Sequence, residues 1–228
     1  MCLLRYIIIF LILFSGSPGL TAQNFAISTD FDRKNGVVED LIDIHVVKNE
    51  IVAVREGVAV HRERLGVHEE VLWKGTRGYV GSVLTNKRLL AVSATIPGWR
   101  TQNLRIEEFA ESAEHEISIS DFLVLAIMPK RVLLFDGLAN DWAQMDIPLH
   151  DPVLDTVLEN FVAAVITDKR VYGVAARRGR FVEERFQANE RVESITSRAH
   201  SVSIRTNRRL LVFRSRSPFW DTIPLRLN

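Results

Sequence analysis

Four arginines recur at one position of a repeated sequence pattern and are the residues of this chain best suited to hold an anion. Three of them follow a polar pair that ends in Lys or Arg, as in "TNKR" at 85–88 and "TDKR" at 167–170, and Arg131 follows Pro129 and Lys130. A guanidinium offers five N–H donors in a fixed fork and can bind a carboxylate, phosphate or sulfate bidentately. Two interpretations are open: one anionic-ligand site, or four separate pairs with acids or carbonyls that fix a turn. The candidate ligand-binding residues are Arg88, Arg131, Arg170 and Arg209.

Large aromatic residues form a second series, twelve residues after the basic residue that precedes each arginine. A flat ring suits stacking on a sugar, whereas an aromatic side chain on an outer strand buries a large area between neighbouring sheets. Because the same position is filled in every copy, we expect packing and interpret the series as structural. Its members are Trp99, Trp142, Phe181 and Trp220.

Metal and catalytic motifs are missing from the sequence. The histidines are scattered, and in "HEE" at 68–70 and "EHE" at 114–116 adjacent strand residues would point to opposite faces. No HExxH, Gly-x-Ser-x-Gly, phosphate-cradling loop or dinucleotide fingerprint occurs. The single cysteine, Cys2, lies in the amino-terminal apolar segment, so the remaining chain has no disulfide or cysteine-based metal site. We expect no catalytic residue, metal or cofactor.

The spacing of the basic residues reveals an internal repeat of about forty residues. Intervals of 43, 39 and 39 residues separate Lys87, Lys130, Lys169 and Arg208, and apolar residues recur at fixed distances on both sides. A weaker copy lies around Lys48 and requires one extra residue in its turn. A fixed period of this length indicates a repeat architecture.

Each copy consists of β-branched and aromatic runs separated by turn residues, which predicts strands. In the fourth copy these runs are "VLDTVLE", "FVAAVIT", "RVYGVAA" and "FVEERFQ", four successive antiparallel strands. The all-β fold expected from five such units of about 39 residues is a five-bladed β-propeller. We expect a strand at 23–30 to close the ring against the carboxyl end, and a short helix within 105–116. The predicted blades are 31–68, 69–109, 110–150, 151–189 and 190–228.

The segment "AVITDKRVYGVAARRGRFVEERF", residues 164–186, resembles the blades of quinoprotein-type and WD-repeat propellers. In both, a strand, a tight polar turn and a second strand precede an aromatic on the outer strand. This chain departs from the WD pattern because the Trp-Asp ending is absent, and it lacks the adjacent cysteines and metal-binding acids of quinoprotein dehydrogenases. Its size and periodicity also resemble five-bladed lectins. The resemblance implies the architecture and no particular activity.

The amino terminus predicts export. Residues 1–22 have a basic start at Arg5, an apolar run from Tyr6 to Phe14 and a tail of small residues, the layout of a signal peptide cleaved after Ala22. Residues 23–228 would then form the propeller in the periplasm or outside the cell, with an uncleaved membrane anchor as the alternative. The formal net charge of +1 falls to about zero without Arg5, which argues against nucleic acid as a partner.

We therefore expect an exported, non-catalytic binding or protein-interaction module whose partner is a protein, a glycan or an anionic ligand. Three alternatives remain open: a lectin-like propeller with one sugar pocket per blade, a small glycosidase-like enzyme, and a membrane-anchored pleckstrin-homology-like protein. The last is suggested by the hairpin "LTNKRLLAV", residues 84–92. Such a domain has this hairpin once, followed by a long helix.

Overall fold

The computed structural model describes residues 40–108, 116–217 and 219–225, which belong to one compact unit. The predicted signal peptide, the strand expected at 23–30 and most of the helix expected within 105–116 lie outside these residues. A 3-10 helix, Ile106–Glu108, is the part of that helix which the structure describes. No helix in the described residues is both long and apolar enough to cross a membrane.

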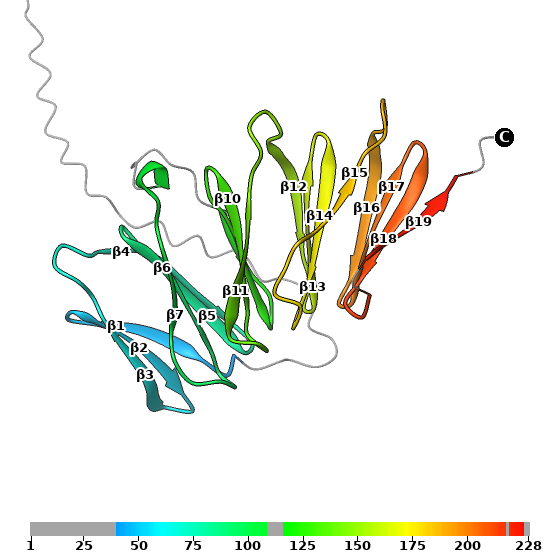
Figure 1. The fold of residues 1–228 in the computed structure, drawn as a ribbon. Coiled ribbons are helices and arrows are strands. Elements are labelled where there is room, and N and C mark those ends of the chain that lie inside the picture. Colours follow the sequence, from blue (N-terminus) through cyan, green and yellow to red (C-terminus); the bar gives the residue numbers. More distant parts are fainter. Residues whose placement is uncertain (1–39, 109–115, 218, 226–228) are drawn as a thin grey trace, which may run out of the picture. The chain divides into compact units, whose positions relative to one another are not determined.

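The described residues fold into five antiparallel sheets that follow one another along the chain (Figure 1). The first sheet contains β1 (Asp43–Val47), β2 (Glu50–Arg55) and β3 (Val58–Arg64). The second contains β4 (Val71–Arg77), β5 (Val80–Thr85), β6 (Arg88–Ser93) and β7 (Arg100–Asn103), and the third contains β8 (Glu116–Ile119), β9 (Leu123–Ile127), β10 (Arg131–Asp136) and β11 (Asp141–Asp146). The fourth contains β12 (Val153–Leu158), β13 (Val162–Thr167), β14 (Arg170–Ala175) and β15 (Val182–Arg185), and the fifth contains β16 (Val192–Arg198), β17 (Ser201–Thr206), β18 (Arg209–Arg214) and β19 (Trp220–Pro224).

Within every sheet each strand pairs with the next one in the sequence, which is the meander of a propeller blade. The predicted all-β class is confirmed, and so are the four-stranded antiparallel units of the second to fifth sheets. The first sheet differs from the prediction, because it has three strands in the described residues. Each sheet lies inside one of the predicted blade ranges. The pleckstrin-homology-like alternative is wrong, because one such hairpin and a long helix cannot account for five repeated sheets.

The first sheet differs from the sequence prediction in its turn. Val47 pairs with Glu50 across a two-residue turn, so no extra residue is inserted. The amide of Leu65 donates to the carbonyl of Asn49 (2.8 Å), as the amide of Leu104 donates to that of Lys87 (2.9 Å). Asn49, rather than Lys48, is therefore the equivalent of Lys87. An alignment of the copies on their basic side chains places the turn one residue too early. The equivalent position is the one whose carbonyl accepts the amide of the linker residue, and in the first sheet that is Asn49.

The two middle strands of a sheet form its core. All six residues of β5 are buried, as are all six of β13, whereas the outer strand β15 buries none of its residues fully. Neighbouring sheets share these cores, since one apolar cluster joins the third sheet to the fourth and another joins the fourth to the fifth. Burial of apolar area between sheets, at about 25 cal/mol per Å², is thus the main force that holds the repeat together.

An aromatic ladder also connects the sheets, through the turn between the first and second strand of each. Tyr79 stacks on Phe122 with ring centroids 4.8 Å apart, Phe122 stacks on Phe161 at 4.9 Å, and Phe161 stacks on His200 at 4.3 Å. These residues occupy one repeat position, eight before the basic reference. Within the described residues no hydrogen bond or ion pair joins the first sheet to the fifth, so closure of a five-bladed ring remains a prediction.

Candidate interaction surface at the linker turns

The four predicted arginines lie at four separate places, and each one is paired with an acid of this chain. Every one of these acids ends a four-residue turn in the linker that precedes the sheet of its arginine. The exposed fraction of the arginine side chains is between 5% and 20%, and that of the acids is at most 3%. The pairs are Arg88–Glu69, Arg131–Glu108, Arg170–Asp151 and Arg209–Glu190. We call them the clasps.

The clasp of Arg88 illustrates the geometry. Its Nε donates to Glu69 Oε1 (2.7 Å), its Nη1 donates to Glu63 Oε1 (2.6 Å), and its Nη2 donates to the carbonyl of Arg64 (2.7 Å). Glu63 and Arg64 belong to β3, so the guanidinium ties the linker acid to the outer strand of the preceding sheet. The donors that would hold an external anion are occupied inside the chain.

The clasp of Arg209 repeats this arrangement in the fifth sheet, at Glu190 Oε1 (2.8 Å), Glu184 Oε1 (2.7 Å) and the carbonyl of Arg185 (2.5 Å). The clasp of Arg131 is the most buried, because Glu108 accepts from both its Nε and its Nη2 at 2.8 Å. The geometry therefore favours the turn-fixing interpretation of the repeated arginines over the anionic-ligand interpretation.

The three clasp glutamates also close their own linker turns through a side-chain oxygen. Glu69 Oε2 accepts the amide of Gly66 (2.6 Å), and Glu190 Oε2 accepts the amide of Gln187 (2.6 Å). Proline at 148 has no amide hydrogen to offer at this position. The acid that follows it is the shorter Asp151, which accepts the amide of Lys169 instead (3.0 Å). Asp151 Oδ2 lies 2.8 Å from Arg170 Nε as an ion pair without the alignment of a hydrogen bond.

The hydrogen bonds of the clasps change the acidity of their glutamates. Burial alone would raise the pKa of Glu69, but hydrogen bonds from Arg88, Gly66 and Thr85 outweigh it and lower this pKa below its ordinary value. The pKa of Glu190 is lowered in the same way, since hydrogen bonds from Arg209 and the amide of Gln187 outweigh the effect of burial. Both side chains are therefore held as carboxylates.

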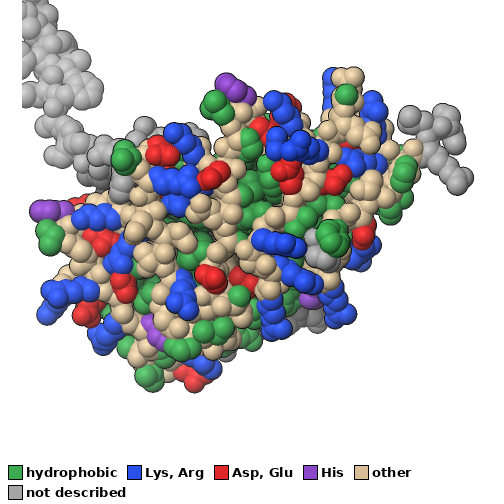
Figure 2. Space-filling model, in the orientation of Figure 1, with side chains coloured by type: hydrophobic (Ala, Val, Ile, Leu, Met, Phe, Trp, Pro, Cys, Tyr) green, Lys and Arg blue, Asp and Glu red, His purple; other side chains and the backbone are tan. Residues whose placement is uncertain are grey.

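The turns held by the clasps present apolar side chains to solvent. The residue two positions before the acid is Val67, Ile106 or Leu149 in the first three linkers, with exposed fractions of 78%, 87% and 86%. The fourth linker has Ala188 at this position, also exposed. Figure 2 shows hydrophobic side chains at the tips of protruding loops, among charged ones. We call Val67, Ile106 and Leu149 the linker row.

The linker turns all lie at the same edge of their sheets. Asn86 lies in the hairpin between the second and third strand, and its backbone amide donates to the carbonyl of Glu70 (3.0 Å). The equivalent Asn207 donates its side-chain amide to the carbonyl of Asn189 (3.1 Å). Each linker therefore lies against the next sheet's hairpin, and the clasp fixes both.

The repeated aromatics pack between sheets. Trp220 is 8% exposed and its indole N–H donates to the carbonyl of Val182 in the preceding sheet (3.0 Å). Trp142 donates likewise to the carbonyl of Arg100 (3.2 Å), while Trp99 and Phe181 are half-buried against other apolar clusters. The lectin-like alternative required one exposed aromatic per pocket, and the buried Trp220 does not meet that requirement.

Sequence reasoning missed the clasp acids, although a signal was present. Glu69, Asp151 and Glu190 each stand 18 residues before their basic reference (87 − 69, 169 − 151, 208 − 190), and Glu108 stands 22 before Lys130. The four extra residues of the third copy, 43 against 39, account for the difference. Among residues 40–108, 116–217 and 219–225, no three His, Cys, Asp or Glu side chains gather in a metal-binding arrangement.

No family model and no curated protein matches this sequence. Similar solved structures include the WD40 domain of SCAP from fission yeast, 10% identical, with 82% of this chain and 56% of that chain covered and a TM-score of 0.37. Apo AztD from Citrobacter koseri is 12% identical (81% and 60% covered, TM-score 0.36), and Prp20p from Saccharomyces cerevisiae is 9% identical (76% and 55%, TM-score 0.36).

This chain thus spans less than two thirds of each of these proteins, and such similarity says nothing of ligand or activity. The order and pairing of the strands are those of successive β-propeller blades, and they define the class of fold without a specific family.

Proposed function

We propose that this chain is an exported, non-catalytic protein-interaction module and that the linker row is its contact surface. The observation that carries the proposal is the exposure of Val67, Ile106 and Leu149 at one equivalent position of three successive linkers. A single exposed apolar residue is ordinary on a protein surface, whereas repeated exposure at one position of three linkers, each held by a buried ion pair, supports an interaction site.

The chemistry of the row favours a protein partner over a glycan. Aliphatic side chains gain free energy by leaving water, and they offer a sugar neither a flat ring nor a hydrogen-bond donor. The next residue in each turn is polar: His68, Glu107 and His150. An apolar centre with a polar rim is the usual composition of a protein–protein interface.

The clasps lower the entropy cost of binding a partner at the linker row. A loop that must be ordered on binding costs conformational entropy, and a turn that is already fixed avoids that cost. Because each clasp anchors its linker to the adjacent hairpin through a buried acid, the turns that carry the row are already fixed before a partner arrives.

The test compares two triple variants of the full chain. The first, Val67→Ser/Ile106→Ser/Leu149→Ser, removes the row. The control, Val58→Ser/Leu72→Ser/Leu154→Ser, removes three strand residues that are 64%, 54% and 63% exposed. Each tagged chain is used for quantitative affinity capture from native extract, and each captured protein is then purified and titrated.

We expect at least one protein to bind the wild-type chain and the control with equal Kd and to bind the row variant at least about tenfold more weakly, a loss of about 1.4 kcal/mol. The proposal fails if every captured protein binds all three chains equally.

A further inference from the structure

The loop between β14 and β15 breaks the repeat in charge. It reads "ARRGRF" at 176–181, with three arginines and no acid, whereas the corresponding loops of the second and third sheets, "ATIPGW" at 94–99 and "GLAN" at 137–140, are uncharged. A residue found in every copy is explained by what every blade needs, as the clasp arginines show. The corresponding loop of the fifth sheet, 215–219, has one arginine, Arg216, which stands 39 residues after Arg177 and is its equivalent. Arg178 and Arg180 have no equivalent arginine in the other copies and call for a separate explanation.

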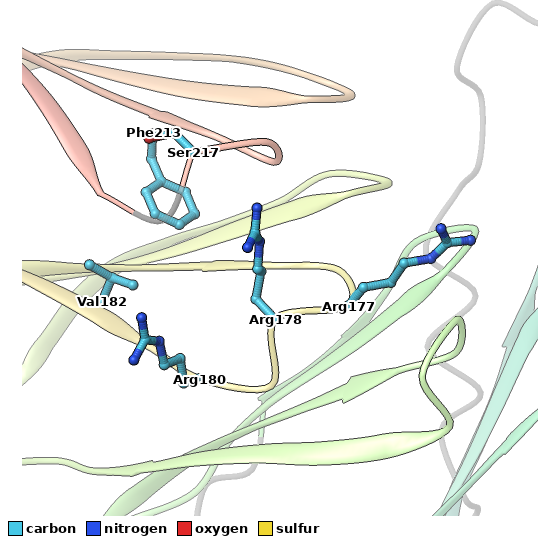
Figure 3. Close-up of a pocket in the computed structure, with 6 residues that line it drawn as sticks. All are labelled: Arg177, Arg178, Arg180, Val182, Phe213 and Ser217. Atoms are coloured by element: carbon cyan, nitrogen blue, oxygen red, sulfur yellow. The ribbon is translucent and has the colours of Figure 1, made fainter.

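This loop forms one wall of a pocket between the fourth and fifth sheets, with a volume of about 370 Å³. Figure 3 shows Arg178 and Arg180 extending from the loop toward the side where Phe213 and Ser217 lie, whereas Arg177 points away. Val182 of β15 and Phe213 of β18 supply an apolar surface next to the two guanidinium groups. The pocket therefore combines positive charge with room for a carbon skeleton.

Backbone and side-chain contacts hold the loop in place. Arg177 has a left-handed backbone conformation (φ 64°) and donates its amide to Asp136 Oδ2 in the third sheet. Arg178 Nη2 donates to the carbonyl of Arg216 (3.1 Å), which links the loop to the one that follows β18. The loop backbone and the Arg178 side chain are thus held by the protein before a ligand binds.

The positive charge at this pocket is not neutralised. Within the described residues neither Arg178 nor Arg180 forms an ion pair, while nearby Arg214 is paired with Asp221 and Arg185 with Glu183. The two guanidinium groups line one pocket, and each can hold the terminal oxygens of a tetrahedral oxyanion bidentately. We propose that this pocket binds a phosphate or sulfate monoester through Arg178 and Arg180.

The pocket is distinct from the linker row. In a meander, the loop after the third strand lies at the opposite end of the sheet from the linker after the fourth strand. The contact between the amide of Ala176 and the carbonyl of Phe161 (3.0 Å) confirms that this loop lies beside the aromatic ladder. A ligand here and a protein partner at the row would occupy opposite edges of the sheets.

The test is isothermal titration of the full chain at low ionic strength with four probes: inorganic phosphate, a hexose 6-phosphate, a hexose 6-sulfate and the neutral hexose. The variant Arg178→Gln/Arg180→Gln is compared with Arg191→Gln/Arg208→Gln, which removes the same charge from exposed arginines that form no ion pair in the described residues. The single variant Arg180→Gln removes a side chain with no hydrogen bond in the described residues and keeps the test valid if the double variant misfolds.

We expect one or both esters to bind the wild-type chain and the control equally, and the pocket variants at least about tenfold more weakly, since hydrogen bonds to charged groups contribute strongly. Preference for the phosphate or the sulfate ester would identify the source of the oxyanion. Three results would overturn the proposal: no ester binds at millimolar concentration, both double variants weaken binding equally, or the neutral hexose binds as well as the esters.

Discussion

Replacing Arg131 by methionine tests the clasp where it is most buried. The exposed fraction of the Glu108 side chain is 0% and that of Arg131 is 5%, and two contacts of 2.8 Å join them. Methionine is apolar and leaves the carboxylate of Glu108 buried without its cation. The amide of Arg105, which donates to Glu108 Oε2 (2.7 Å), would be its remaining hydrogen-bond donor in the clasp.

The expected loss is large, because breaking a buried ion pair from one side costs about 3–5 kcal/mol. In a chain of this size about 1 kcal/mol shifts Tm by roughly 2–4 °C, so the variant should melt about 6–20 °C lower than the wild type. Adding Glu108→Gln should recover at least about half of the loss, because a neutral amide costs less to bury than an unpaired charge.

The assay is urea denaturation followed by tryptophan fluorescence, with Arg62→Met as the control. Arg62 pairs with Glu50 at 3.0 Å, but the two side chains are 62% and 40% exposed, so its loss should cost less than about 1 kcal/mol. A free energy of unfolding for Arg131→Met within about 0.5 kcal/mol of the wild type would refute the structural role of the clasp.

Three further predictions concern the glutamates, the sheet contacts and the ladder. Because the pKa values of Glu69 and Glu190 are lowered by folding, their contribution to stability is present above the ordinary glutamate pKa of about 4.3 and is lost as the pH falls through the lowered values. The variant Glu69→Gln/Glu190→Gln should therefore show a flatter dependence of the urea midpoint on pH between about 3 and 5, and an unchanged slope would contradict this. Gly173→Ala should destabilise the chain by about 1–3 kcal/mol, because its Cβ would lie 2.7 Å from the Phe213 ring, and an unchanged urea midpoint would argue against this packing. Phe161→Ala should cost about 2 kcal/mol, less than a fully buried phenylalanine, since its ring is only partly buried; a loss below about 0.5 kcal/mol would show that the ladder does not stabilise the fold.

The repeat could be predicted from the sequence because each copy must bury the same middle strands. Valine and alanine runs such as those of β13 are apolar on both faces, which identified them as central strands. The turn after β1 was misplaced because Lys48 resembles Lys87 in charge, while the backbone pairing makes Asn49 its equivalent. Residue types alone do not determine which backbone groups pair across a turn.

The sites were harder to predict than the fold, for a physical reason. The sequence identified the repeated arginines, but their partner acids lie in linkers 19 to 23 residues away and meet them only after the sheet has formed. The linker row could not be predicted from the sequence, because it is defined by the exposed fractions of its side chains. A valine such as Val67 is as typical of a buried core as of a surface turn. The loop of Arg178 and Arg180 can be recognised from the sequence, because it contains more arginines than the corresponding loops of the other copies.

The central claim is that the linker row contacts a protein partner, and hydrogen–deuterium exchange of the full chain with and without a captured partner tests it most directly. We predict that the amides protected by the partner lie in the linker turns, at 65–69, 104–108 and 147–151. Protection confined to the loops at the opposite edge, such as 94–99 and 176–181, with no change in the linker turns would contradict the claim.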